Sequence, residues 1–434
     1  MRMSVIGCGY LGTTHAACMA ELGFEVLGVE IDDGKRASLS SGSVPFYEPE
    51  LPSLLAKHVE TGRLRFTDSL AEAAEFADLH FLCVGTPQRS DSIGADLTFV
   101  DDAIQTLAPH LTRPSLVIGK STVPVGTARR LAEHLVSAAP AGTEARLAWN
   151  PEFLREGFAV QDTLRPDRLV FGVSEASVLD TFRLVYAEAL AAGVPEVVTD
   201  LETAEMVKVA ANAFLATKIS FINAMSEICE VVGADVVKLA DAIGHDDRIG
   251  RKFLNAGIGF GGGCLPKDIR AFQHRARELG VEDATKFLLD IDAINTRRRA
   301  VVVNSAVEQL GESGRIAVLG AAFKPNSDDI RDSPALWIAQ ELERIGFEVV
   351  VHDPQAVSNA RSRYPLMNFS DTAEEALRGA DLVLHLTEWQ EYRDLDPHKV
   401  GEMVNRRSII DGRNALDVDA WRSAGWTFRS MGRP

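Results

Sequence analysis

The sequence lacks the features of membrane-spanning, nucleic-acid-binding and disulfide-bonded proteins. No stretch of its 434 residues reaches about eighteen uninterrupted apolar residues, so we expect no transmembrane helix and no membrane partner. The formal net charge of −17 argues against nucleic acid or an anionic surface as the main partner. Five cysteines, an odd number scattered along the chain, indicate reduced thiols rather than a disulfide framework. Together these absences predict a cytoplasmic protein.

The chain is long enough for more than one hydrophobic core. At 434 residues, with 46% hydrophobic and 25% charged residues, it has an ordinary globular composition, and two or three domains are expected. The apolar segment 1–7 is too short for a signal peptide and continues directly into a glycine motif. We therefore interpret it as a first strand.

The first half of the chain alternates between strand-like and helix-like segments. Residues 3–7 and 25–30 are apolar runs typical of buried strands, and residues 13–22 between them have a helical pattern. Further strands are predicted at 79–84, 116–119 and 169–173. This alternation predicts a parallel sheet with helices on both faces.

The middle of the chain is helical. A long Ala-rich helix is predicted over 202–232, ending at Gly233, and a second over about 283–310, ending at Gly311. This region could join two lobes and form a dimer surface, which makes a homodimer or higher homo-oligomer our expectation.

The strand pattern of the N-terminal part returns after Gly311. Residues 315–320 are similar to 2–7, 347–353 to 24–30, and 380–386 to 77–83. We therefore predict an α/β protein with two Rossmann-like, doubly wound parallel-sheet domains joined by a long-helix central region. The predicted domains cover residues 1–200, 201–310 and 311–434. Because the second lobe lacks a complete glycine fingerprint, we expect it to bind a nucleotide-sugar rather than a dinucleotide.

The first glycine motif points to a dinucleotide. It follows a predicted strand, opens a helix and matches GxGxxG in Gly7-Cys8-Gly9-Tyr10-Leu11-Gly12. Glu30 stands 18 residues beyond Gly12, at the end of the second strand, where a carboxylate can accept from ribose hydroxyls. A carboxylate there would repel a 2′-phosphate, which favours NAD. The nearby Lys35 and Arg36 keep NADP open.

Two threonines follow predicted strands. Thr86 lies in Val84-Gly-Thr-Pro87 and Thr122 in the segment 120–127, each at the end of a strand where cofactors gather in such sheets. Thr-Pro turn chemistry explains both equally well.

The stretch 257–268 carries the strongest chemical signal. Its many glycines before Cys264 form a loop that can wrap a ligand and place sulfur beside it. Lys267 and a following helix N-terminus would lower the pKa of the thiol, and Asp268 could handle protons. The setting is a poor one for core filling, whereas we expect Cys18, Cys83 and Cys229 to be small buried residues.

Other charged residues have an ordinary alternative. Lys208 and Asn212 are four residues apart on the long predicted helix and share a face, although a solvated lysine is the default interpretation. The remaining candidate cations are surface residues by default, and several lie in turns suited to phosphate capture: Arg248, Arg251, Lys252, Lys324, Arg331 and Arg413.

These motifs, in this order, resemble the UDP-glucose/GDP-mannose dehydrogenase family over nearly the whole chain, and its UDP-glucose branch most. The quoted matches are GCGYLG, VGTP, STVPVGT, NPEFLREG (150–157), EMVKVAANAFLA, RIGRKFL (248–254), GFGGGCLPKD, FKPNSDDIRDSP and DGRNAL. The resemblance implies a NAD-dependent, four-electron oxidation of UDP-glucose to UDP-glucuronate. GDP-mannose or a UDP-hexosamine is the alternative substrate.

The resemblance also implies residue roles. Cys264 would attack the C6 aldehyde, Lys208 and Asn212 would stabilise the oxyanion, and Asp268 with Thr122 and Glu152 would position or deprotonate water. The implied cofactor contacts are Gly7, Gly9, Tyr10, Leu11, Gly12, Glu30, Lys35, Thr86, Thr122, Glu156, Lys267 and Arg331. The implied substrate contacts are Glu152, Phe153, Leu154, Lys208, Asn212, Arg248, Phe253, Gly261, Lys324 and Arg413, and Arg248 would serve a neighbouring subunit. No metal is expected.

Two positions depart from the family pattern, and two other functions compete. Glu30 stands where many members have Asp, and Gly263 stands where Ser or another residue is often seen before the cysteine.

The first competing function is that of a hydroxyacid dehydrogenase. Such an enzyme needs neither Cys264 nor residues 313–434, so their presence counts against this function. The second is that of a NAD-dependent binding or regulatory protein that is not an enzyme. The presence together of Cys264, Lys208, Asn212 and Asp268 counts against it.

Overall fold

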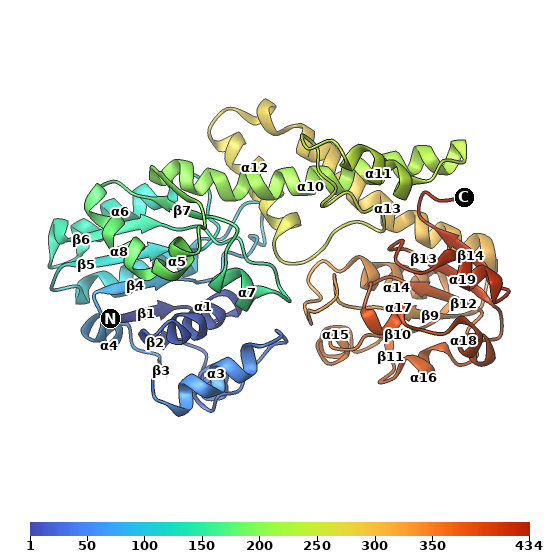
Figure 1. Cartoon of the computed structure of the whole chain (residues 1–434), viewed down its shortest axis with the longest axis horizontal. Helices are drawn as coiled ribbons and strands as arrows, with labels where there is room; N and C mark the ends of the chain where they lie inside the picture. Colours follow the sequence, from blue (N-terminus) through green and yellow to red (C-terminus); the bar gives the residue numbers. More distant parts are fainter. The chain divides into compact units, whose positions relative to one another are not determined.

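The computed structural model describes all 434 residues as two compact units (Figure 1). One unit comprises Met1–Ala211 with Arg270–Leu279, and the other comprises Asn212–Ile269 with Gly280–Pro434. Two long helices contribute residues to both, α10 (Leu201–Val232) and α12 (Leu265–Glu278). No helix combines the length and the apolar character needed to cross a bilayer.

The first unit contains an eight-stranded sheet in the order β3-β2-β1-β4-β5-β6-β7-β8. Its strands are β1 (Arg2–Ile6), β2 (Glu25–Val29), β3 (Leu64–Thr67), β4 (Leu79–Leu82), β5 (Ser115–Gly119), β6 (Ala145–Trp149), β7 (Leu169–Gly172) and β8 (Glu196–Thr199). Its helices are α1 (Tyr10–Glu21), α2 (Asp33–Ser40), α3 (Leu51–Glu60), α4 (Leu70–Phe76), α5 (Thr98–Leu107), α6 (Thr127–Ala138), α7 (Ala159–Leu164), α8 (Leu179–Val185) and α9 (Ala187–Ala191).

Alternating side chains of this sheet enter two separate cores. In β5, Leu116 and Ile118 pack into one cluster and Val117 into the other. Since successive side chains of a strand point to opposite faces, both faces are covered. The predicted doubly wound fold is confirmed. One pairing departs from a purely parallel sheet, because β6 and β7 meet in antiparallel fashion at Trp149 and Gly172.

The second unit repeats the pattern with a six-stranded parallel sheet in the order β11-β10-β9-β12-β13-β14. Its strands are β9 (Arg315–Leu319), β10 (Glu348–His352), β11 (Asn368–Phe369), β12 (Leu382–His385), β13 (Ser408–Asp411) and β14 (Thr427–Ser430). Its helices are α11 (Val236–Gly244), α13 (Phe287–Leu310), α14 (Pro334–Ile345), α15 (Val357–Arg363), α16 (Ala373–Leu377), α17 (Gln390–Arg393), α18 (Pro397–Met403) and α19 (Val418–Ser423). The predicted second Rossmann-like lobe is confirmed.

An aromatic stack in the first unit allows a test of this packing. Phe171 of β7 is fully buried, and its ring lies 4.3 Å from that of Phe182 on α8. We expect Phe171→Ala to lower the free energy of unfolding by about 3 to 5 kcal/mol, because it leaves a cavity against β7. Urea unfolding measures this. The control Phe99→Ala removes a ring that is 48% exposed, and equal losses for the two variants would contradict the described core.

Candidate active site

The glycine fingerprint forms a tight connection between β1 and α1. A Cβ atom on Gly12 would lie 1.9 Å from the carbonyl oxygen of Gly7, so only glycine fits at this close approach. Gly9 stands at the N-terminus of α1, and nothing lies within 4 Å of its Cβ position. There is therefore open space beside Gly9 at the N-terminus of α1, an arrangement that fits the pyrophosphate of a dinucleotide.

Glu30 directly follows β2, as expected for a ribose contact. It is 7% exposed, and its carboxylate accepts a hydrogen bond from the amide of Asp32 at 3.0 Å. The Arg36 guanidinium donates to the Glu30 carbonyl oxygen rather than to its carboxylate, and Lys35 is exposed on α2. The carboxylate at this strand end fits the NAD that the sequence predicts.

Tyr10 has an internal partner that the sequence does not reveal. Its hydroxyl donates to the Glu48 carboxylate and accepts from the Gly157 amide at 3.1 Å. Glu48 also accepts from the amides of Gly157 and Ala159, and burial raises the pKa of Tyr10. Tyr10 thus connects the GxGxxG motif (7–12) to the NPEFLREG segment (150–157). Glu48 carries no periodic signal by which the sequence could identify it.

The segments after β4, β5 and β6 come together. The Thr86 hydroxyl donates to the carbonyl oxygen of Thr122 at 2.8 Å, a contact that joins the loop after β4 to the loop after β5. Glu152 accepts from the amides of Phe153 and Leu154 at 2.6 and 2.7 Å, which orients its carboxylate. These predicted residues therefore share one edge of the sheet.

Helix α10 brings Lys208 to the first unit. Its ammonium nitrogen lies 5.5 Å from the centre of the Phe153 ring, so Lys208 is not a fully solvated lysine. One turn earlier, the buried Glu205 accepts from the amides of Gly126 and Ala128, each at 2.7 Å, at the start of α6. Burial raises the pKa of Glu205 to about 7. Glu205 ties α10 to the STVPVGT segment, a role that the sequence analysis missed.

Cys264 of the second unit stands at the N-terminus of α12. Its carbonyl oxygen accepts from the Asp268 amide at 2.8 Å, and its side chain is exposed. The other four cysteines are buried, as expected for Cys18, Cys83 and Cys229. A helix N-terminus favours negative charge and therefore the thiolate form.

Asp268 gathers two of the other predicted residues. Its carboxylate accepts from the Asn212 side-chain amide at 2.6 Å and forms an ion pair with Lys267, also at 2.6 Å. Asp268 is 3% exposed, so both of these contacts are shielded from bulk water. The Lys267 ammonium and the Asp268 carboxylate thus lie within four residues of Cys264 in the sequence, and the Asn212 amide contacts Asp268.

The glycine loop before Cys264 is fixed through its backbone. Asn295 of α13 pairs with Phe260 twice, accepting from its amide at 2.7 Å and donating to its carbonyl oxygen at 3.0 Å. A Cβ atom on Gly259 would lie 2.4 Å from the Asn295 side-chain oxygen. Three loop amides donate outward: Gly257 to the Asn223 side-chain oxygen, Ile258 to the Gly412 carbonyl oxygen and Gly262 to the Arg331 carbonyl oxygen. Two guanidinium groups donate to loop carbonyl oxygens, Arg413 to that of Gly259 and Arg299 to that of Phe260. We call residues 257–263 with these partners the loop clamp.

Arg413 is part of the loop clamp. Its guanidinium donates to the carbonyl oxygens of Leu386 at 2.7 Å, Gly259 at 3.0 Å and Phe323 at 3.1 Å. Burial lowers the pKa of this guanidinium. Arg413 therefore holds the loop, and its predicted contact with substrate stays a prediction.

The remaining candidates of the second unit lie in turns. Arg331 forms an ion pair with Asp329 through two guanidinium nitrogens. Arg248 forms the same kind of ion pair with Asp246 on an exposed turn. The ammonium nitrogen of Lys324 lies 5.4 Å from the centre of the Phe323 ring. Phe253 has a left-handed backbone, and the Cβ position of Gly261 lies 2.3 Å from the carbonyl oxygen of Asp332.

Comparison with known proteins covers the whole chain. Residues 1–190 match the NAD binding domain of the UDP-glucose/GDP-mannose dehydrogenase family, residues 202–297 its central domain, and residues 317–418 its UDP binding domain. The chain belongs to this family. The resemblance inferred from the motifs is confirmed, and so is the NAD-binding character of the first lobe.

Relatives of this dehydrogenase family member align along its full length. A UDP-glucose 6-dehydrogenase (TuaD) of Bacillus subtilis is 41% identical, covering 100% of this chain and 93% of that protein. A UDP-glucose 6-dehydrogenase of Rhizobium meliloti is 39% identical, with 100% of each covered. The solved UDP-glucose dehydrogenase of Pyrobaculum islandicum is 35% identical, with a TM-score of 0.91 and coverage of 100% and 98%.

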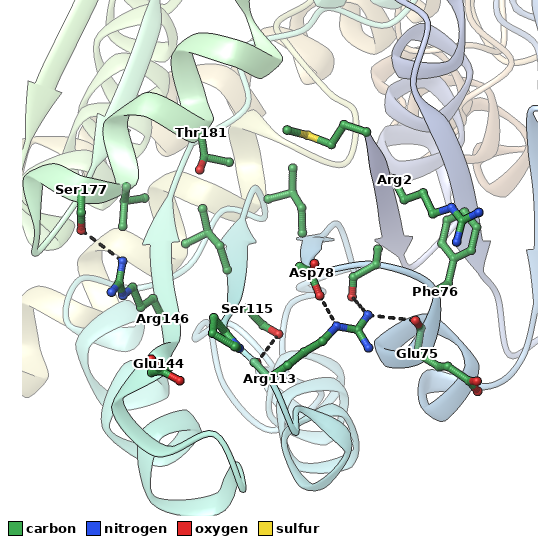
Figure 2. A pocket seen from close by; sticks show the side chains of 16 residues that line it. Arg2, Glu75, Phe76, Asp78, Arg113, Ser115, Glu144, Arg146, Ser177 and Thr181 are labelled. Atoms are coloured by element: carbon green, nitrogen blue, oxygen red, sulfur yellow. Dashed lines mark hydrogen bonds and ion pairs between the residues drawn. The ribbon is translucent and has the colours of Figure 1, made fainter.

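A groove of about 680 Å³ lies elsewhere on the first unit of this dehydrogenase (Figure 2). Its residues stand at the amino ends of the strands, including Arg2 of β1, Ser115 of β5 and Arg146 of β6. Figure 2 shows Arg113 between Asp78 and Glu75, and Arg146 against Ser177. In parallel sheets, ligands bind at the carboxyl ends of the strands, so this groove is not the proposed site.

The loop clamp yields a prediction for Asn295. We expect Asn295→Ala to lower kcat at least tenfold and the free energy of unfolding by about 1 to 3 kcal/mol, because the buried Phe260 amide loses its acceptor. The alkylation rate of Cys264 by iodoacetamide, which reports the exposed thiol, should also change. The neighbouring Thr296→Ala, which loses only a bond within α13, serves as control. Unchanged kcat and alkylation in Asn295→Ala would show that the clamp does not position the nucleophile.

Proposed function

We propose that this protein is a NAD-dependent UDP-glucose 6-dehydrogenase that oxidises the C6 alcohol of UDP-glucose to the carboxylate of UDP-glucuronate. The family, with its NAD binding and UDP binding domains, supports this activity, as do full-length relatives that carry this name. The single observation that carries the mechanism is the exposed Cys264 at the start of α12, beside Lys267 and Asp268. A simple hydroxyacid dehydrogenase needs no such thiol.

The first lobe offers the groups that a dinucleotide requires. The amides at the start of α1 can bind its pyrophosphate, and Glu30 can accept from its ribose hydroxyls. When bound, NAD supplies the acceptor for a hydride. We propose that the other expected cofactor contacts, Leu11, Lys35, Thr86, Glu156, Lys267 and Arg331, complete the site during turnover.

The proposed reaction passes through the sulfur of Cys264. The C6 alcohol loses a proton and a hydride to give the aldehyde, and the Cys264 thiolate attacks the aldehyde carbon. The resulting thiohemiacetal loses its hydroxyl proton and gives a second hydride to a second NAD, and so becomes a thioester. Lys208 and Asn212 stabilise the developing oxyanion, each contributing about 3 to 4 kcal/mol by analogy with other oxyanion donors. An amide nitrogen carries two hydrogens, so Asn212 can donate to Asp268 and to substrate together.

Hydrolysis of the thioester requires a base. Asp268 and Glu152 are the candidate carboxylates, with side-chain exposures of 2% and 16% respectively. We propose that Glu152 takes the proton of the attacking water, since it is the more accessible of the two, and that Thr122 helps to position this water. Asp268 then has the role of orienting Asn212 and Lys267.

The nucleotide end of the substrate belongs to the C-terminal lobe in this proposal. Residues 317–418 match the family's UDP binding domain and contain Lys324 and Arg413. We propose that these two cations bind the UDP-sugar together with Phe153, Leu154, Arg248, Phe253 and Gly261. Because Arg248 lies on an exposed turn, it can reach a second copy of the chain.

The stoichiometry of NADH tests the proposed function. We expect two NADH for each UDP-glucose consumed, because both hydride transfers precede release, and we expect much slower reduction with GDP-mannose and UDP-N-acetylhexosamines. NADH absorbance with limiting nucleotide-sugar measures both. One NADH per sugar would contradict the four-electron mechanism, and a preference for another nucleotide-sugar would contradict the specificity.

We also propose that the enzyme is a cytoplasmic homo-oligomer, at least a dimer, formed along α10. Phe214, Phe221 and Ile228 recur every seven residues, followed by Val232, and all four are exposed; Phe214 is 65% and Phe221 47% exposed. An apolar stripe of this kind needs a cover, and a second copy of the same helix supplies a self-complementary one.

A charge in this stripe tests the oligomer. We expect Phe221→Asp to shift the mass from dimer or larger to monomer in size-exclusion chromatography with light scattering, because it places a charge at the centre of an apolar interface. Leu366→Asp, at an isolated residue that is 98% exposed, is the matched control and should leave the mass unchanged. A wild-type mass of one chain at micromolar concentration would contradict the proposal.

A further inference from the structure

A buried ammonium lies behind the proposed hydrolytic base. Lys120 follows β5 and is 5% exposed, and its ammonium nitrogen lies 3.0 Å from the Asn150 side-chain oxygen, 3.4 Å from the Tyr186 hydroxyl and 3.2 Å from a Glu152 carboxylate oxygen. An ammonium group has three hydrogens, and here it has three acceptors. This position is therefore fully satisfied as a cation.

The direction of every hydrogen bond in this group is fixed. The Asn150 amide nitrogen donates to the Val170 carbonyl oxygen at 3.0 Å, which turns the Asn150 side-chain oxygen toward Lys120. The Tyr186 hydroxyl donates to that same oxygen at 2.6 Å, so its own oxygen is left to accept from Lys120. The network therefore presents three acceptors to the Lys120 nitrogen, which matches the three donors of an ammonium.

The backbone places these residues before any side chain acts. Lys120 and Asn150 directly follow the paired ends of β5 and β6, where Gly119 lies opposite Trp149. The backbone amide of Asn150 donates to the Gly119 carbonyl oxygen at 2.8 Å, and the backbone amide of Lys120 donates to the Leu82 carbonyl oxygen at 2.9 Å. The network is therefore built on the rigid edge of the sheet.

Glu152 is the anion that balances this cation. The other ionisable neighbours remain neutral, because burial raises the pKa of Cys83 to about 12 and also raises that of Tyr186. Burial alone would lower the pKa of Lys120, but the negative charge of Glu152 beside it favours the ammonium, and the pKa of Lys120 lies above its usual value. A buried charge of this kind is stable only with its partner.

We infer that Lys120 is a positioning residue for thioester hydrolysis, holding Glu152 as an oriented carboxylate. One Glu152 oxygen faces Lys120 and the other accepts from the Phe153 and Leu154 amides, so the group cannot rotate freely. In the step it serves, the water oxygen bonds to the thioester carbon and the water proton passes to Glu152. The carbon–sulfur bond breaks and sulfur leaves as the Cys264 thiolate, with no change in oxidation state. This inference rests on the proposed function.

Rapid-mixing kinetics of Lys120→Met test the inference. Both hydride transfers precede hydrolysis, so we expect a fast phase that releases two NADH per active site at the wild-type rate. A steady-state rate lowered about 10- to 100-fold should follow, as for loss of a hydrogen bond to a charged group. A purely structural defect would slow both phases together. Unchanged turnover, or a fast phase slowed in parallel, would overturn the inference.

Three further variants make the test decisive. Lys57→Met removes an exposed lysine that is paired with Glu21 and should behave as wild type. If Lys120→Met fails to fold, Tyr186→Phe, which deletes one hydroxyl of the network, replaces it. This variant should show an unchanged fast phase and a steady-state rate that is lowered less than in Lys120→Met. An unchanged steady-state rate in Tyr186→Phe would then overturn the inference. Glu152→Gln separates the two proposals. If it stalls after two NADH while Lys120→Met resembles wild type, only the inference fails; if it turns over normally, the proposed role of Glu152 fails.

Discussion

The position of Cys264 depends on one backbone constraint, the loop clamp over residues 257–263. A segment so rich in glycine has many conformations when unfolded, and a thiol at its end would have no fixed position. Partners from α10, α13 and the loops after β9 and β13 form hydrogen bonds with the backbone of this segment. Cys264 then begins α12 at a defined place, where the helix favours its thiolate.

Buried charges in both units fasten loops rather than stabilise cores. Glu205 caps the start of α6 from α10, Lys120 fixes Glu152, and Arg413 binds three carbonyl oxygens. In the second unit, Asp411 accepts from buried His385 and from the amides of Arg413 and Leu416, and these contacts lower its pKa against the effect of burial. Each such charge is costly unless its partners are in place, so each couples a loop to the correct fold of its surroundings.

Much of the fold could be predicted from the sequence because its signals are periodic. The helix expected over 202–232 is α10 (Leu201–Val232), and the similarity of 315–320 to 2–7 reflects β9 and β1 in equivalent places of two sheets. Strands β3, β6 and β8 of the first sheet and β11, β13 and β14 of the second were not predicted. In β3 and β6, for example, Leu64–Thr67 and Ala145–Trp149 mix polar, small and apolar residues, and their pairing with neighbours decides their conformation. The antiparallel β6–β7 contact has no local signal either.

The residues of the candidate site also fall into two groups, those that the sequence marks and those that only the fold reveals. Motif residues such as Cys264 and Glu30 can be named as candidates from the sequence because glycines and strand ends mark them. Glu48, Glu205, Asn295 and the role of Lys120 cannot, because their partners lie 30 to 111 residues away in the sequence and only the fold brings them together. Arg413 illustrates a further limit, since the sequence indicates a cation but not the three carbonyl oxygens that it binds.

The most direct test of covalent chemistry at Cys264 is peptide mass spectrometry of enzyme quenched with acid within milliseconds of mixing with UDP-glucose and NAD. The account predicts a nucleotide-sugar acyl group on the peptide that contains Cys264, and none in Cys264→Ser. An acyl group on a different residue, or undiminished production of UDP-glucuronate by Cys264→Ser, would contradict it.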